Sequence, residues 1–162
     1  MPVEKSLVSD TRPLKVLVSA FAFSPIKGSE FGVGWDYVRA VALRHKVWVI
    51  TRSNEREETE QYLQHHRDAL CNVSVHYVPL KNRTINIPLR EIVYGLIYRN
   101  WQQRAYRLAR ALDAEVDFDL VHHLNGIDRS ANSADGCGIV KLICRCWARL
   151  ECQNHHLLGA PI

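Results

Sequence analysis

The chain has 162 residues, the usual size of a single domain. Hydrophobic residues make up 47% of it and charged residues 23%, which is typical of a globular protein and excludes a collagen-like or disordered one. The formal net charge of +4 favours an anionic partner, such as a phosphate, a nucleotide or an acidic membrane surface.

No apolar run in the sequence reaches the roughly 20 residues that a transmembrane helix needs. The longest run, residues 16–23, has the length of a strand and is interrupted by Ser19. Residues 1–13 are expected to be a flexible N-terminal segment, and they contain no apolar core that could act as a signal peptide. We therefore expect a cytoplasmic protein.

Short runs rich in β-branched residues alternate with helical patterns along most of the chain. The runs predict four buried strands, over residues 14–21, 47–51, 73–78 and 118–122. Strict alternation of strands and helices is typical of βαβ units on a parallel sheet. The predicted fold class is therefore α/β, with a doubly wound parallel sheet.

Three helices are predicted between these strands. The first has apolar residues at helical spacing, namely Trp35, Val38, Ala42 and Leu43. The second is expected to begin at a cap formed by Asn54, followed by an acidic first turn. The third carries one apolar stripe from Tyr94 to Leu112.

The alternation stops after Ile127, and the last segment is rich in cysteine. Four of the five cysteines lie in residues 128–162, at positions Cys137, Cys144, Cys146 and Cys152. Structural zinc sites favour ligand pairs two to four residues apart, so this spacing favours fortuitous clustering over a metal site. The odd count also argues against a disulfide framework.

The loop after the first predicted strand is the first candidate for ligand contact. Ligands of doubly wound sheets bind at the carboxyl ends of the strands, and residues 24–35 follow such an end. Gly28, Gly32 and Gly34 let the backbone approach a ligand and let the next helix direct its N–H groups at an anion. We favour contact with a phosphate or a sugar over a turn that needs glycine only for its dihedral angles.

A dinucleotide site does not fit this loop. Tyr37 stands where the glycine motif needs a glycine or an alanine. Thr51 and Arg52 occupy the end of the second predicted strand, where an acidic residue would bind the ribose. The pattern therefore excludes NAD. NADP stays possible only because Arg52 stands where the acidic residue would be.

Two histidines end the fourth predicted strand. Because side chains alternate along a strand, His122 and His123 are expected to point to opposite faces of the sheet. His122 is the candidate for the cleft, where it could donate a hydrogen bond to a sugar or phosphate, or carry a proton near neutral pH. A hydrogen-bonded core histidine is the alternative.

Three segments, taken in order, resemble family 4 glycosyltransferases of the GT-B fold. They are residues 28–35 (GSEFGVGW), residues 45–52 (HKVWVITR), and Trp101-Gln102 followed by residues 118–123 (FDLVHH). The resemblance covers roughly residues 14–127 and implies the Rossmann-like, acceptor-side domain of a retaining enzyme. It implies a nucleotide-sugar donor, a sugar or lipid-linked acceptor, and no metal or other cofactor.

The resemblance also implies roles for individual residues. His122 matches the histidine beside the transferred sugar, and is the expected catalytic residue. The residues expected to bind substrate are Gly28, Ser29, Glu30, Gly32, Gly34, Arg52 and His123. The likeness ends near Ile127, and residues 128–162 look like translation out of frame. We therefore expect a truncated enzyme, incomplete as a domain and inactive by itself.

Two other functions stay open. A basic stretch could lie on anionic lipid at the inner face of a membrane, although a solvated basic face is favoured. Its residues are Lys81, Arg83, Arg90, Arg99, Arg104, Arg107 and Arg110, against the single acid Glu91. An unfinished sheet edge would also suit pairing with a separate partner chain. A nucleic-acid partner is not expected, because no binding motif is present.

Overall fold

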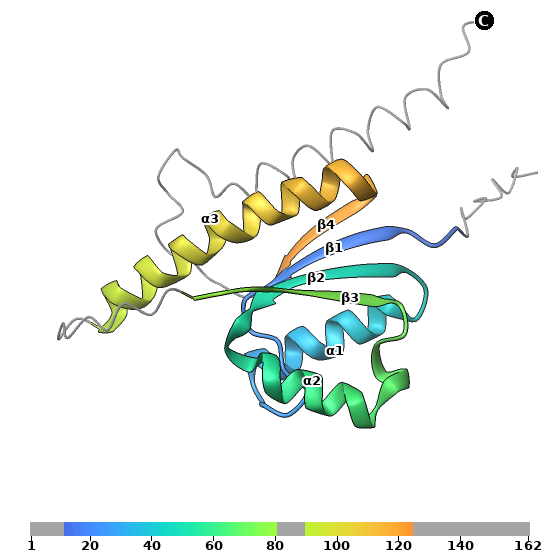
Figure 1. Cartoon of the computed structure of the whole chain (residues 1–162), viewed down its shortest axis with the longest axis horizontal. Helices are drawn as coiled ribbons and strands as arrows, with labels where there is room; N and C mark the ends of the chain where they lie inside the picture. The colour runs from blue at the N-terminus through green and yellow to red at the C-terminus, as the bar shows by residue number, and fades with distance from the viewer. Residues whose placement is uncertain (1–11, 81–89, 125–162) are drawn as a thin grey trace, which may run out of the picture.

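The computed structural model describes residues 12–80 and 90–124, with side chains in the second range from residue 94 onward. Its four parallel strands form one sheet in the order β3-β2-β1-β4. The strands are β1 (Lys15–Ala20), β2 (Lys46–Arg52), β3 (Val73–Val78) and β4 (Leu120–Leu124). Helices α1 (Glu30–Ala42) and α2 (Arg56–His65) cover one face, and α3 (Arg90–Val116) covers the other (Figure 1). The predicted α/β class with a parallel sheet is confirmed.

Each face of the sheet has its own hydrophobic layer. The layer under α3 is rich in aromatic rings, and it includes Phe21, Tyr98, Trp101 and Phe118. The layer under α1 and α2 is mostly aliphatic, and it includes Val16, Val18, Val38, Val47 and Val49. Strand residues reach both layers because successive side chains point to opposite faces. A sheet buried on both faces explains why the strands are nearly continuous apolar runs.

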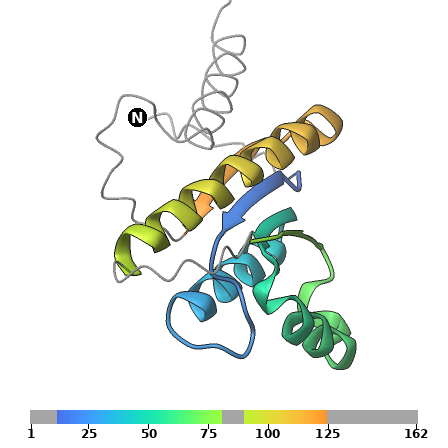
Figure 2. The ribbon, with the colours of Figure 1, turned by 60° about the vertical axis from the view of Figure 1, so that its left-hand side comes forward.

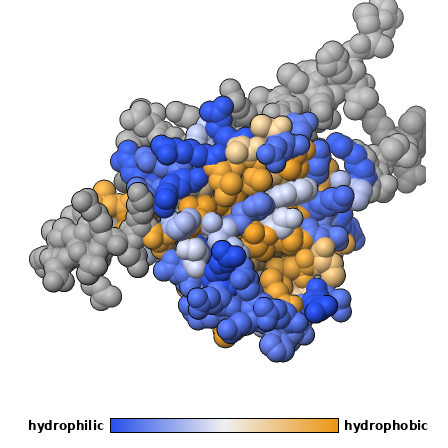
Figure 3. Space-filling view, viewed as in Figure 1, coloured by the Kyte–Doolittle hydropathy of each residue, from blue (hydrophilic) through white to orange (hydrophobic). Residues whose placement is uncertain are grey.

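The spacing of apolar residues on the helices matches the faces that they bury. In α1, Trp35, Val38 and Ala42 are buried. In α3, Tyr98, Trp101, Ala105 and Ala109 are buried. Most of the exposed surface of α3 and of α2 is hydrophilic, and hydrophobic side chains are visible between the two helices (Figure 3). The helical predictions are confirmed for these segments, except that Tyr94, the first residue of the predicted stripe of α3, is 56% exposed because it lies near the beginning of the helix.

The fourth strand begins two residues later than predicted. Asp117 has a positive φ of 55°, so the chain turns sharply after α3. Phe118 is then buried in the layer under α3, and its backbone N–H donates to Asp113 Oδ1 at 3.2 Å. Regular pairing with β1 starts with Leu120 opposite Val16. As a result, both histidines lie inside the strand rather than at its end.

Two further local predictions are wrong. Asn54 does not cap α2; it lies in a short 3-10 turn, η1 (Ser53–Glu55), and α2 starts at Arg56 without a side-chain cap. The turn is tightened by Glu55, whose carboxylate accepts hydrogen bonds from Arg52. Leu43 is 83% exposed instead of buried, because α1 ends at Ala42 and Leu43 follows the last turn.

A second 3-10 turn, η2 (Arg67–Leu70), joins α2 to β3. None of the helices in residues 12–80 and 90–124 has both the length and the apolar character that crossing a bilayer requires. Residues 1–11 of the predicted N-terminal segment and the cysteine-rich residues 128–162 lie outside the described residues.

Candidate functional site

The loop between β1 and α1 lies beyond the carboxyl end of the sheet and makes a broad turn before the helix (Figure 2). Ser24, which is fully buried, accepts hydrogen bonds from the backbone N–H groups of Ile26 and Lys27, both at 3.3 Å. This serine turn holds the loop against the end of β1. The loop is therefore anchored at its start, as a ligand-binding loop on a rigid scaffold should be.

The first turn of α1 begins without a side-chain cap. Ser29 precedes the helix, has a φ of 56° and a ψ of −134°, and makes no capping hydrogen bond. The first N–H groups of a helix have no partner within the helix, and they carry the positive end of its dipole. The Ser29 side chain therefore caps none of these N–H groups, which lie next to the loop.

The three predicted glycines have different places around this turn. Gly28 lies in the loop, and a Cβ added to it would meet no atom within 4 Å. Gly32 lies in α1, where an added Cβ would come within 3.4 Å of the Lys27 carbonyl oxygen. Gly34 is buried inside α1. The positive φ of this segment belongs to Ser29, and neither Gly28 nor Gly32 adopts a left-handed backbone.

A cluster of four charged side chains lies beside the loop. Arg52 Nε and Nη2 donate to the Glu55 carboxylate at 2.8 and 2.7 Å. Lys27 Nζ lies 3.4 Å from Glu55 and 3.5 Å from Glu58. Glu55 is only 4% exposed, so it is a buried carboxylate paired with two cations. Two cations face two carboxylates, so the cluster has no formal net charge.

Aromatic rings hold the guanidinium of Arg52. Its Cζ lies 4.7 Å from the ring centre of Phe21 and 4.8 Å from that of Phe31. Arg52 therefore joins the end of β2 to the end of β1 and to the first turn of α1. The cation of this cluster with more solvent access is Lys27, whose side chain is 41% exposed. Lys27 is better placed than Arg52 to contact an anion in solution.

His122 is paired with a tyrosine of α1. The Tyr37 hydroxyl is hydrogen-bonded to His122 Nδ1, and the two rings meet edge to face with centres 4.8 Å apart and planes at 82°. Burial raises the pKa of Tyr37, so the phenol keeps its proton at neutral pH. His122 is half-buried on the α1 side of the sheet. The loop between β1 and α1 (residues 21–29), called the glycine loop below, leads into the same helix.

His123 lies on the opposite side of the sheet. Its Nε2 is 3.0 Å from the Tyr98 hydroxyl of α3, and its Nδ1 is buried without a hydrogen-bond partner in the described part of the chain. Burial lowers the pKa of His123, and the neighbouring His122 lowers it further. The prediction that the two histidines point to opposite faces is confirmed.

The structure thus groups some of the predicted site residues and separates others. Gly28, Ser29, Glu30 and Gly32 lie around the start of α1, and Arg52 reaches the same turn through Phe31. His122 contacts the same helix further along, at Tyr37. His123 is on the far face and is not part of this group.

Sequence reasoning missed Lys27, Glu55 and the role of Tyr37. Glu55 looked like an ordinary acid of a helix N-terminus, and only its burial distinguishes it from Glu57 or Glu60. Tyr37 stood out only as a residue that breaks a dinucleotide motif. No spacing signal could have revealed its contact with His122, which is 85 residues away in the chain.

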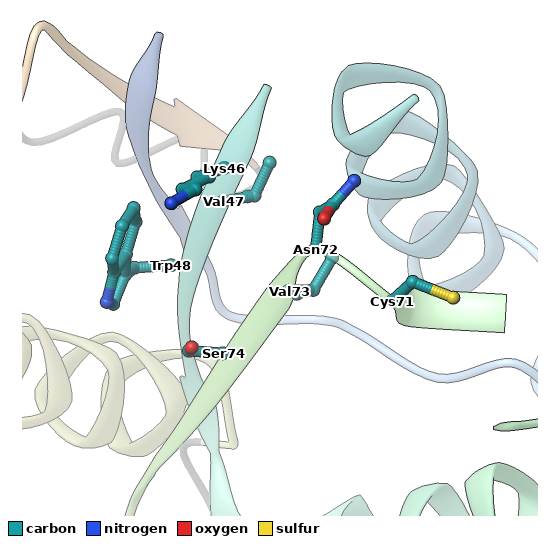
Figure 4. Close-up of a pocket in the computed structure, with 7 residues that line it drawn as sticks. All are labelled: Lys46, Val47, Trp48, Cys71, Asn72, Val73 and Ser74. Atoms are coloured by element: carbon teal, nitrogen blue, oxygen red, sulfur yellow. The ribbon is translucent and has the colours of Figure 1, made fainter. Parts of the chain in front are cut away.

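A pocket lined by described residues lies elsewhere in the sheet. It has a volume of about 210 Å³ and is lined by Lys46, Val47, Trp48, Cys71, Asn72, Val73 and Ser74 (Figure 4). These residues surround the amino ends of β2 and β3, at the opposite end of the sheet from the glycine loop. Ligands of such sheets bind at the carboxyl ends, so we give the loop precedence over this pocket.

Within residues 12–80 and 90–124, no three His, Cys, Asp or Glu side chains form a group that could hold a metal ion. Comparisons of the chain with protein-family models, with curated proteins and with solved structures found no match. The assignment of function therefore depends on the fold and on the chemistry of the residues around the start of α1.

Proposed function

We propose that this chain is the acceptor-side, Rossmann-like domain of a retaining glycosyltransferase with the GT-B fold. In this proposal a second domain, of the same or another chain, supplies most of the contacts to the nucleotide-sugar donor. The described residues form a partial domain of such an enzyme, which binds ligand but does not turn it over alone. The acceptor is a sugar or a lipid-linked sugar.

The observation that supports this proposal best is what surrounds α1. The first turn of α1 has no side-chain cap, and the N-terminus of a helix attracts anions. Lys27 stands beside this turn, and its side chain is 41% exposed while its ammonium pairs with Glu55 and Glu58. Along the same helix, Tyr37 holds His122, whose imidazole can bond a sugar hydroxyl. Donors of this kind can stabilise a departing diphosphate electrostatically, without a metal.

A titration followed by backbone amide NMR tests the proposal. The probes are a panel of nucleotide-sugars, simple saccharides and inorganic pyrophosphate, each added to the full chain. We expect changes in amide chemical shift confined to residues 24–34, 52 and 122. The variant His122→Ala should bind the sugar-containing probes more weakly than the unchanged chain does. A response centred on the pocket at Asn72, or no response to any probe at millimolar concentration, contradicts the proposal.

A second candidate function is contact with an anionic membrane surface through α3. Between Tyr94 and Leu112 this helix has no acidic residue, and it carries four arginines, Arg99, Arg104, Arg107 and Arg110. Leu96 is 60% exposed near its beginning. The buried stripe of α3 packs on the sheet, so contact would use arginine head groups rather than insertion of the helix.

Vesicle flotation separates this candidate from a solvated basic face. We expect salt-sensitive binding to vesicles that contain anionic lipid, and loss of binding in the double variant Arg99→Glu/Arg107→Glu. The control is Arg39→Glu/Arg44→Glu, which makes the same change of charge at exposed arginines in or just after α1. Equal loss in both variants indicates a response to net charge alone and rejects a specific α3 surface.

A further inference from the structure

The contact between Tyr37 and His122 constrains the imidazole in two ways. The hydrogen bond holds Nδ1, and the edge-to-face packing of the two rings holds the plane of the imidazole. The two residues come from different elements, α1 and β4, and both elements are packed against the core. His122 therefore has a defined orientation before any ligand arrives.

The direction of this hydrogen bond decides what His122 can offer. A neutral imidazole has one N–H donor and one nitrogen lone pair, and its partner decides which nitrogen carries the proton. Within the described part of the chain, the Tyr37 hydroxyl is hydrogen-bonded to His122 Nδ1. That hydroxyl has one proton to donate, and burial raises the pKa of Tyr37, so the proton stays on the phenol.

We infer that Tyr37 is a positioning residue for His122: its hydroxyl donates to Nδ1, which leaves the imidazole proton on Nε2 as a donor to ligand. A donor at this position suits an oxygen acceptor, such as a sugar hydroxyl or a phosphate. The part of this inference that concerns ligand binding rests on the proposed function. The position of the proton does not, and it can be measured in the free protein.

Other histidines of the chain serve as internal references for both tautomers. His65 Nδ1 and His66 Nδ1 lie 2.9 and 3.0 Å from backbone carbonyl oxygens, which only accept, so these nitrogens carry the proton. His45 Nδ1 lies 3.2 Å from the Leu14 backbone N–H, which only donates, so His45 carries its proton on Nε2. We expect His122, like His45, to carry its proton on Nε2.

Imidazole ¹⁵N chemical shifts of the full chain, measured at about pH 8 where ordinary histidines are neutral, test the assignment directly. We expect His122 to show an unprotonated Nδ1 like that of His45, and the reverse of His65 and His66. Substitution of each histidine by glutamine assigns the signals. If His122 shows a protonated Nδ1, the inference is overturned whatever the variants do.

The substitution Tyr37→Phe tests whether the tyrosine is responsible. It keeps the ring and removes only the hydroxyl, so the Nδ1 lone pair becomes free. We expect the His122 nitrogen shifts to move toward a mixture of tautomers, and carbethoxylation of His122 by diethyl pyrocarbonate to become several-fold faster. An unchanged tautomer and an unchanged reaction rate reject the positioning role.

Tyr98→Phe is the matched control, because it removes the hydroxyl that contacts His123 on the other face. It should change the His123 signals and leave those of His122 as they were. Pyrophosphate and saccharide titrations then separate the two proposals. Absence of ligand binding together with an Nε2-protonated His122 refutes the proposed function alone, whereas binding by a chain with an Nδ1-protonated His122 refutes the inference alone.

Discussion

His122 and His123 are neighbours on β4, yet they belong to different chemical regions of the protein. His122 faces α1, where it pairs with Tyr37 beside the candidate site. His123 faces α3, where it pairs with Tyr98 and where burial lowers its pKa. The residue type and the strand are the same. The layer of side chains that each histidine meets decides its hydrogen-bond partner and its burial.

The same contrast separates the two faces of the sheet. Under α3, aromatic rings meet edge to face, with Phe21 5.0 Å from both Tyr98 and Trp101. Beyond the α1 face, the loop between β1 and α1 is held by a serine turn and lies beside a cluster of charges around the buried Glu55. We therefore expect substitutions under α3 to change stability alone, and substitutions around the start of α1 to change stability less and, under the proposed function, ligand binding as well.

The largest expected effect is that of Trp101→Ala, under α3. Trp101 is 1% exposed, and its removal leaves a cavity among rings that cannot close around it. The free energy of unfolding should fall by about 3–5 kcal/mol, measured by urea denaturation. Trp101→Phe keeps an aromatic ring and should cost clearly less. A loss below about 1 kcal/mol for Trp101→Ala would mean that this layer is not a packed core.

Glu55→Gln tests the charged cluster beside the loop. The change keeps the shape of the side chain but leaves Arg52 and Lys27 without the buried carboxylate that they share. Unfolding by urea should show a loss of about 1.5–3 kcal/mol, the range for hydrogen bonds to charged groups. Glu57→Gln is the control, since Glu57 is exposed in the first turn of α2. Equal effects of the two variants would show that burial of Glu55 contributes nothing.

Acid should destabilise the protein through His123. Its pKa is lower in the folded state than the ordinary value of 6.5, so the unfolded chain binds more protons below about that pH. Stability should therefore fall as the pH drops below about 6.5, by at most about 1.4 kcal/mol per pH unit for one group.

The substitution His123→Gln should make this dependence on pH shallower. Some dependence should remain, because burial also lowers the pKa of His76. Urea denaturation at several pH values measures the slope, with His122→Gln as the control for the other face. If both variants flatten the slope equally, the two histidines do not differ in the way that the structure describes.

The smallest expected effect is a gain in stability from Ser29→Gly. The positive φ of Ser29 is unfavourable for any residue with a Cβ, and its hydroxyl makes no capping hydrogen bond that would be lost. After the entropy that glycine loses on folding, about 0.5–1 kcal/mol of stabilisation should remain. Ser29→Ala removes the hydroxyl and keeps the unfavourable backbone, so it should bring no gain. Destabilisation by Ser29→Gly would show that the hydroxyl is needed.

Much of the fold was predictable because its signals are local. Residues 73–78 match β3 as predicted, since a buried strand is a short run of apolar, β-branched residues. The start of β4 was misplaced, because Phe118 is as apolar as a strand residue and is buried in the same layer. Asn54 is a residue type that is common at helix caps, but it lies in a 3-10 turn whose last residue, Glu55, pairs with Arg52.

By itself, the sequence determined the class of the fold, the order along the chain of the α-helices and strands in residues 12–80 and 90–124, and the opposite orientation of the two histidines. These properties depend on periodicity and composition over short stretches of chain. Only the tertiary structure decided that Tyr37 meets His122, that Glu55 is buried between two cations, and that Arg52 is held by two rings. Those contacts join residues from different elements, and they form only when the helices pack on the sheet.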